Sequence, residues 1–456
     1  MLNAKEKRVA ILGVAIDNVT MDEVLETIEA QIKEGGFHQI ATANADFLIK
    51  SINDEELCEV LCRCDLVLAD GMPLVWASSL MGNGLRERVA GADLVPQLAA
   101  LSARRGYRIF LLGAGEESSA GTAEAMERIY PGLCIAGRYS PEHKQLDEMD
   151  HEEILSRIEA ARPDILLVAF GNPKQEKWLA MHRHRLTVPV CIGVGGSFDF
   201  MSGKVRRAPE WMKRSGMEWF YRMAQEPSRM VSRYAGNAVG LLRHLPLQVA
   251  ALAMQTKRRR PAQIANKYAG GVAILHIEGD FTGEIVQRFE MDVRNAIVSG
   301  SHMVLDMSAT ASIGADALGS IIYATKIARK WKRELWVAGM HGFQHWILRS
   351  AKLKPFFRMA PTVAEALRRI EPDSLPNMQF GRGRPIFSIG SQLIPTHAPE
   401  VPQAYRRALQ LLNQAPIGVD ELALPTMRSG VEPLNRTNEI HSFGSDLLKV
   451  QTQAQG

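Results

Sequence analysis

Apolar and polar positions follow two alternating periods along the first 200 residues. Short apolar runs of strand length, such as 107–112, are separated by stretches with apolar residues at helical spacing, such as 117–129. The alternation begins with the run 8–14 and ends with the run 188–194. This order predicts an α/β fold, a Rossmann-like and mostly parallel sheet with helices on both faces.

A second, smaller α/β pattern follows the first. Between 261 and 371, an apolar run at 271–279 precedes helical stretches at 284–298 and 317–331. From 372 to 456, Pro, Gly, Gln, Ser and Asn dominate and no long apolar periodicity survives. We expect a second α/β domain and then a disordered tail.

Composition excludes several classes of protein. The chain is 46% hydrophobic and 23% charged, close to globular averages. No run of about 18 apolar residues predicts a transmembrane helix, and the N-terminus does not resemble a signal peptide. Five cysteines, an odd number, favour reduced thiols in the cytosol.

The segment 204–260 is strongly basic. It carries 13 Lys and Arg against three acids, a local net charge of +10, with Trp211, Trp219 and Phe220 among them. The apolar stretch 235–255 within it suits an element lying on an anionic membrane surface. A helix packed on the first domain, followed by a basic linker, is the alternative, and single-stranded nucleic acid is a third, disfavoured partner.

Polar and glycine residues follow the predicted strands where each one ends. The carboxyl ends of parallel strands meet at one edge of a sheet, where ligands bind. These positions are Thr42, Asn44, Asp70, Gly113, Gly115, Gly171 to Gln175 and Gly195 to Asp199.

Two of these positions, together with Arg88 further along the chain, suggest chemistry. Asp70, before a glycine, can present a carboxylate as a general base. Arg88 offers a planar fork of donors suited to a diphosphate. In the turn 171–175, Pro173 suits a first helical turn whose free N–H groups favour an anion, and Gln175 is expected to point its amide into the cleft.

Other chemistries are disfavoured. The pair Gly113-x-Gly115 lacks the third glycine of a dinucleotide fingerprint, and no Gly-Lys-Ser/Thr follows the glycines at 193–196. The sequence has no metal-ligand motif and no nucleophile elbow, so we expect neither a metal nor a cofactor.

Six motifs, in order and in register over about residues 8–240, resemble those of the WecG/TagA/CpsF glycosyltransferases (glycosyltransferase family 26). They are Thr42 with Asn44, Ala69 to Pro73, Glu87 to Asp93, Gly171 to Glu176, Gly193 to Asp199, and Arg207 to Pro209. One departure is Ala43, where the family often has Pro, which puts only the shape of that turn in doubt.

The resemblance implies an inverting, metal-independent transfer of a sugar from a UDP-sugar to a polyprenyl-diphosphate-linked sugar. The donor sugar would be N-acetylmannosamine, its uronic acid or a hexose. The setting would be bacterial exopolysaccharide or cell-surface polysaccharide biosynthesis, on the inner face of the cytoplasmic membrane. The sequence leaves the sugars, the linkage and the oligomeric state open.

The resemblance also implies roles for individual residues. Asp70 matches the general base, and Arg222, Arg229 and Arg233 match arginines that close over the diphosphate. The rest of the catalytic set is Thr42, Asn44, Arg88 and Gln175. The other substrate-binding positions are Gly171, Pro173, Lys174, Gly195, Gly196 and Asp199.

Residues 271–370 resemble a STAS domain. Gly314-Ala315 stands where regulatory relatives carry Asp-Ser, so a phosphoswitch there is disfavoured and docking of a protein partner is favoured. The alternative function is a catalytically silent UDP-sugar-binding scaffold that signals through this domain; the intact Asp70 argues against it. The predicted division is a glycosyltransferase core (1–203), a membrane-associating appendage and linker (204–260), the STAS-like domain (261–371) and the tail (372–456).

Overall fold

The computed structural model describes residues 8–214, 216–255, 260–269, 271–353, 356–370, 386–389 and 392–395. All of these residues belong to one compact unit. The predicted tail, 372–456, lies outside the described residues except for strands β15 (Ile386–Ile389) and β16 (Gln392–Pro395). Within the described residues, none of the helices combines the length and the apolar character needed to span a bilayer.

The first domain contains the predicted parallel sheet. Its strand order is β4-β3-β8-β7-β5-β6, and every neighbouring pair is parallel. The strands are β3 (His38–Ala43), β4 (Leu66–Ala69), β5 (Arg108–Gly113), β6 (Cys134–Tyr139), β7 (Ile165–Ala169) and β8 (Val190–Gly193).

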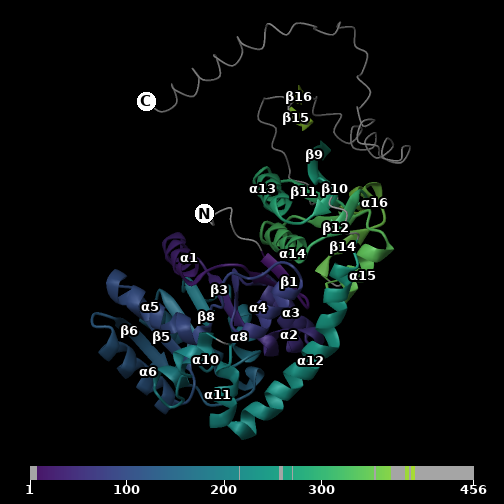
Figure 1. Ribbon diagram of the computed structural model, residues 1–456. Helices are drawn as coiled ribbons and strands as arrows, with labels where there is room; N and C mark the ends of the chain where they lie inside the picture. Colours follow the sequence, from purple (N-terminus) through teal and green to yellow (C-terminus); the bar gives the residue numbers. More distant parts are fainter. Residues whose placement is uncertain are drawn as a thin grey trace, which may run out of the picture. The chain divides into compact units, whose positions relative to one another are not determined.

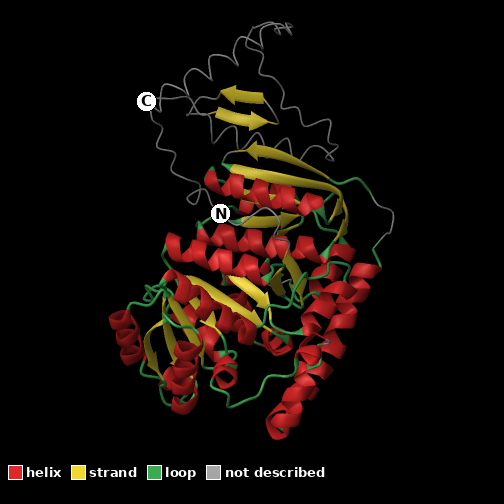
Figure 2. Cartoon of the chain, turned by 60° about the vertical axis from the view of Figure 1, so that its left-hand side comes forward, coloured by secondary structure: helices red, strands yellow, loops and turns green. Residues whose placement is uncertain are grey.

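Helices cover both faces of this sheet (Figures 1 and 2). Alternate residues of a strand point to opposite faces, so Ile109 and Leu111 join one core cluster while Phe110 and Leu112 join another. The first cluster includes residues of α1 (Met21–Glu34), α5 (Gly91–Arg105) and α6 (Glu116–Ile129). The second includes residues of α7 (His151–Ala161) and α8 (Lys174–Met181). The prediction of a doubly covered parallel sheet is confirmed.

The structure differs from the sequence prediction at two places in this domain. The run 8–14 does not enter the parallel sheet; β1 (Arg8–Ile11) and β2 (Val14–Asp17) form an antiparallel pair of their own. Strand β6 was not predicted, because its residues are half-buried or exposed and leave no apolar run.

Short helices connect the strands that bear the site. They are α2 (Ala45–Asn53) after β3, then α3 (Glu55–Arg63), and α4 (Met72–Leu80) after β4. Helix α9 (Ser197–Met201) follows β8 and precedes the basic segment. The basic segment then forms α10 (Glu210–Arg214), α11 (Glu218–Gln225) and α12 (Pro227–Ala253). Helix α12 runs without a break through Pro246 and packs on α2 and α11 (Figure 1).

The second domain is a smaller α/β fold. Its sheet has the order β14-β13-β11-β10-β9-β15-β16, with β12 paired to β10. The remaining strands are β9 (Gln263–Ala269), β10 (Val272–Phe281), β11 (His302–Asp306), β12 (Thr310–Ile313), β13 (Leu335–Ala338) and β14 (Arg358–Ala360). The helices are α13 (Glu284–Val298), α14 (Ala315–Lys330), α15 (Gly342–Ser350) and α16 (Val363–Arg369).

Candidate active site

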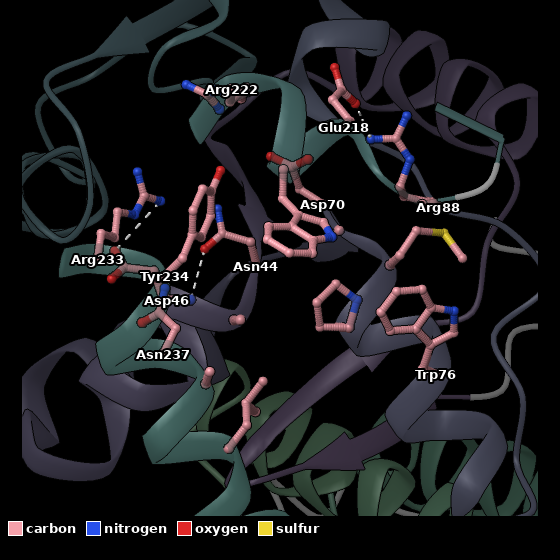
Figure 3. A pocket seen from close by; sticks show the side chains of 18 of the residues that line it. Asn44, Asp46, Asp70, Trp76, Arg88, Glu218, Arg222, Arg233, Tyr234 and Asn237 are labelled. Atoms are coloured by element: carbon pink, nitrogen blue, oxygen red, sulfur yellow. Dashed lines mark hydrogen bonds and ion pairs between the residues drawn. The ribbon is translucent and has the colours of Figure 1, made fainter. Parts of the chain in front are cut away.

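A cavity of about 330 Å³ lies at the carboxyl ends of β3 and β4. Two regions far apart in the sequence line it: the segments that follow these strands, and the helices α11 and α12 (Figure 3). Of the predicted site residues, it brings together Asn44, Asp70, Arg88, Arg222 and Arg233.

The turn after β4 positions Asp70. The Asp70 backbone N–H donates to the carbonyl of Ala43, 2.7 Å away, which ties the ends of β3 and β4 together. Gly71 follows with a φ of 151°, a conformation that side-chain-bearing residues rarely adopt, and a Cβ built on it would lie 3.8 Å from the Cβ of Asn44. Asp70 and Asn44 therefore lie in the same cavity.

Asp70 has an unusual environment for a carboxylate. Burial raises its pKa from 3.8 to about 6, while Arg88 and Arg222 pull the pKa back down. Glu218 and Asp93 add a smaller upward effect. A carboxylate with a pKa near 6 is ionised at neutral pH and is still basic enough to accept a proton in a reaction.

Arg88 belongs to a cluster of four charges. It donates to Asp93 (2.6 Å) and Glu218 (3.2 Å), and Arg207 pairs with the same two acids at 2.6 and 3.1 Å. The two positive charges of the arginines balance the two negative charges of the acids. The cluster fixes α11 to the start of α5, so Arg88 holds the cavity wall in place and is already neutralised by carboxylates.

Arg222 and Arg233 are less fully paired. Arg222 stacks on Phe200 with 4.8 Å between its Cζ and the ring centre, and forms no ion pair within the described residues. Arg233 lies 3.8 Å from Asp46. The Nε of each arginine is buried without a hydrogen-bond partner. Because unpartnered buried donors are costly, these two guanidinium groups are suited to an anionic ligand. The Arg229 side chain lies outside the described residues.

Gln175 does not point into the cavity, so that prediction is wrong. Its side chain is buried at 1% exposure, and its Oε1 accepts from the N–H groups of Gly171 (3.0 Å) and Gly195 (3.2 Å). Its Nε2 donates to Glu176 at 2.7 Å. Gln175 therefore joins the turns after β7 and β8.

The remaining predicted residues lie around these two turns. Thr42 donates to the carbonyl of Gly193 at 2.8 Å, and Asp199 accepts from Ser118 at 2.8 Å. Lys174 donates to the carbonyl of Lys144 and lies over the ring of Phe170. The others in this second group are Gly171, Pro173, Gly195 and Gly196; none of the group lines the cavity.

Two contacts link the second group to the cavity. A side chain built on Gly196 would begin 3.4 Å from the Arg222 guanidinium. The amide of Asn172 donates to Asp46, which lines the cavity, at 3.1 Å. The two groups are therefore neighbours, and one extended ligand can reach both.

Sequence reasoning missed several cavity residues. Asp46, Tyr234 and Asn237 were not singled out, although Arg233, Tyr234 and Asn237 recur at the spacing of one helix face. Trp76 of α4 and Trp219 of α11 add aromatic walls, with exposures of 47% and 41%. Within the described residues, no three His, Cys, Asp or Glu side chains converge to hold a metal ion.

A carboxylate among arginines at the carboxyl edge of a parallel sheet is an arrangement suited to binding an anionic ligand beside a general base. Comparison with known proteins specifies the class: residues 9–259 match the model of the glycosyl transferase WecG/TagA/CpsF family, and residues 263–366 match the STAS domain. The chain belongs to the WecG/TagA/CpsF family of glycosyltransferases and carries a STAS domain after the family's region.

Curated relatives share one activity by name. A Bacillus subtilis protein is 38% identical over 190 residues, 42% of this chain and 72% of its own length. A Bacillus spizizenii protein is 37% identical over 205 residues, which are 45% of this chain and 77% of its own length. A Staphylococcus aureus protein is 28% identical over 258 residues, which are 56% of this chain and 96% of its own length. Each is named N-acetylglucosaminyldiphosphoundecaprenol N-acetyl-beta-D-mannosaminyltransferase.

Proposed function

We propose that this glycosyltransferase transfers N-acetylmannosamine, its uronic acid or a hexose from a UDP-sugar to a polyprenyl-diphosphate-linked sugar, with inversion. The observation that carries the proposal is Asp70, a carboxylate with a pKa of about 6 in a cavity with Arg222 and Arg233. The names of the relatives support the lipid-linked acceptor.

In the proposed step, an acceptor hydroxyl attacks the anomeric carbon of the donor. Its proton passes to the Asp70 carboxylate as the new C–O bond forms and the bond to the UDP oxygen breaks. UDP leaves with the bonding electrons, and Arg222 and Arg233 face the negative charge that builds on the diphosphate. We propose that these arginines do this without a metal ion or any cofactor.

We also propose that the protein is peripheral on the inner face of the cytoplasmic membrane. Trp211 and Phe220 are 63% and 48% exposed beside the cavity helices, within the basic segment 204–260. Aromatic rings beside arginines suit the interface of an anionic bilayer. We propose in addition that the boundaries between the parts of the chain lie at 203/204, 260/261 and 371/372. We also propose that the STAS domain binds a protein partner.

The test is UDP release from a panel of UDP-sugars, with polyprenyl-diphosphate-linked GlcNAc or glucose as the acceptor. Acceptor-dependent release from one donor would support the proposal and identify the sugar, and EDTA would test the independence from metal. Binding of UDP without release from any donor would favour the silent scaffold. Flotation with anionic liposomes tests the membrane contact.

A further inference from the structure

Asp46 is an acid in the wall of a cavity that we assign to a diphosphate. It occupies the first turn of α2, is 8% exposed, and lines the cavity beside Asn44 (Figure 3). A negative charge at this place repels an anionic ligand. Its presence therefore calls for a reason other than contact with that ligand.

The partners of Asp46 come from three separate parts of the chain. Its Oδ2 lies 2.9 Å from the Lys50 ammonium, 3.1 Å from the Asn172 amide and 3.8 Å from the Arg233 guanidinium. Lys50 also donates to the carbonyl of Asn172 at 2.9 Å. One carboxylate thus joins α2, the turn after β7 and α12.

These contacts orient the Arg233 side chain but do not use all of its hydrogen-bond donors. Its Nε is buried without a hydrogen-bond partner, and it meets Asp46 only at the outer limit of an ion pair. An arginine held from one side by a carboxylate keeps its other donors for a second anion. The geometry matches a cation that is positioned in advance for a ligand.

We propose that Asp46 is a positioning residue, which fixes the Arg233 guanidinium and the Asn172 turn in the arrangement that receives the diphosphate. This inference rests on the proposed function, which supplies the diphosphate. If Asp46 acted only through its charge, or instead by positioning Arg233, the variant Asp46→Asn would change the affinity for an anion in opposite directions. Loss of a like charge would tighten the binding of an anion, whereas loss of positioning would weaken it.

The experiment measures binding of inorganic pyrophosphate and of UDP to the full-length chain by isothermal titration calorimetry. For Asp46→Asn we expect the Kd of pyrophosphate to rise about 10-fold, a loss of the order of one charge-assisted hydrogen bond. Asp46→Glu should restore most of the affinity. Asp46→Asn combined with Arg233→Gln should lose less binding free energy than the sum of the two single variants, because part of the effect of Asp46 acts through Arg233.

A matched control is Asp22→Asn. Asp22 holds the same second position in α1 that Asp46 holds in α2, but it is exposed, so the variant alters the helix terminus alone and should leave the Kd unchanged. Should Asp46→Asn fail to fold, Asn172→Ala removes one partner of the carboxylate and should raise the Kd about 3-fold.

Three results separate the inference from the function. Wild-type protein that binds neither UDP nor pyrophosphate overturns the proposed function and the inference with it. Wild-type binding with equal or tighter binding by Asp46→Asn overturns the inference alone, as do additive effects in the double variant. In turnover, positioning raises KM more than it lowers kcat, whereas a loss of folded protein lowers the apparent kcat without changing KM.

Discussion

At the scale of single residues, the cavity keeps a carboxylate basic by withdrawing it from water. Burial raises the pKa of Asp70 to about 6, and Arg88 and Arg222 limit the rise. Below this pKa the carboxyl is protonated and cannot accept the proton of the acceptor hydroxyl. We therefore expect kcat/KM to increase with pH up to about 6 and then to level off.

Asp70→Asn removes the base and keeps the size of the side chain. We expect kcat to fall by about 10²- to 10⁴-fold, because proton transfer contributes on that scale, while the Kd of UDP changes little. Turnover with labelled donor measures the fall in kcat, and calorimetry with UDP measures the Kd. Turnover at the wild-type rate would exclude Asp70 as the base.

Thermal unfolding supplies the folding control for this variant. A folded-state pKa of about 6 against an ordinary value of 3.8 means that the ionised carboxylate destabilises the fold, fully above pH 6 and not at all below pH 3.8. Asp70→Asn should therefore have a higher Tm than wild type at pH 8. A lower Tm would assign its loss of turnover to damaged structure.

Glu176 provides a second prediction at this scale. It is 1% exposed, accepts from Gln175, and burial raises its pKa from 4.5 to about 8. Stability from this group is present below pH 4.5 and is lost as the pH rises through 8, because the unfolded chain ionises first. Compared with wild type, Glu176→Gln should lose less stability between pH 5 and pH 9. Equal losses in Tm over that range would contradict the pKa shift.

At the scale of elements, the close packing of α12 on α2 completes the cavity. A side chain built on Gly240 would place its Cβ 2.7 Å from the Ile49 side chain, whereas one on Gly236 in the same helix would meet nothing within 4 Å. Gly236→Ala should stabilise the protein by about 0.5–1 kcal/mol through helix propensity. Gly240→Ala should instead destabilise it by about 1–3 kcal/mol through overpacking, and should raise KM for the donor.

Urea unfolding of the two alanine variants, with KM measured alongside, checks this prediction. Both variants carry the same chemical change on the same helix, so the difference between them isolates the contact with α2. If Gly240→Ala proved as stable as Gly236→Ala, α12 would not be held against α2 at this point.

The elements also show how far the sequence could predict the structure. The buried strands of the parallel sheet were predicted because their apolar runs are continuous, and Asp70 because it follows one of them. Strand β6 was missed because most of its side chains face solvent at least in part. Gln175 was misplaced because strand-end position alone does not show that two backbone N–H groups already occupy its oxygen.

The pairing of Arg233 with Asp46 could not be predicted for a different reason. Arg233 was expected at the site only through the family resemblance, and Asp46 was not expected there. Arg233 and Asp46 are 187 positions apart in the chain, and nothing local in either segment indicates the other. Only the packing of α12 on α2 brings them to 3.8 Å. Long-range pairs of this kind depend on tertiary contacts, which single-sequence patterns do not record.

At the scale of the whole molecule, a buried ion cluster joins the glycosyltransferase region to the STAS domain. Arg8 of β1 lies 2.7 Å from Asp17 and 3.2 Å from Glu290 of α13, and its guanidinium stacks on Tyr323 of α14 at 3.7 Å. Ser320 donates to Glu290 at 2.6 Å. The side chains of Arg8 and Asp17 are no more than 5% exposed.

Arg8→Gln should therefore cost much more stability than the loss of a surface pair. It leaves the buried Asp17 and Glu290 carboxylates without their shared cation, which costs about 3–5 kcal/mol in comparable buried pairs. Arg63→Gln is the control: Arg63 pairs with Glu59 at 2.5 Å, but both side chains are about half exposed. Such a pair contributes about 0–1 kcal/mol.

Urea unfolding of the full chain, followed by circular dichroism, compares the two variants. A cluster that couples the two domains should also make Arg8→Gln unfold in two separated transitions, because the free energy that ties one domain to the other is lost. Equal and small losses in both variants would mean that the domains fold independently. In that case removal of residues 262–456 would leave the stability of the glycosyltransferase region unchanged, whereas coupling through Arg8 predicts that the same truncation lowers it.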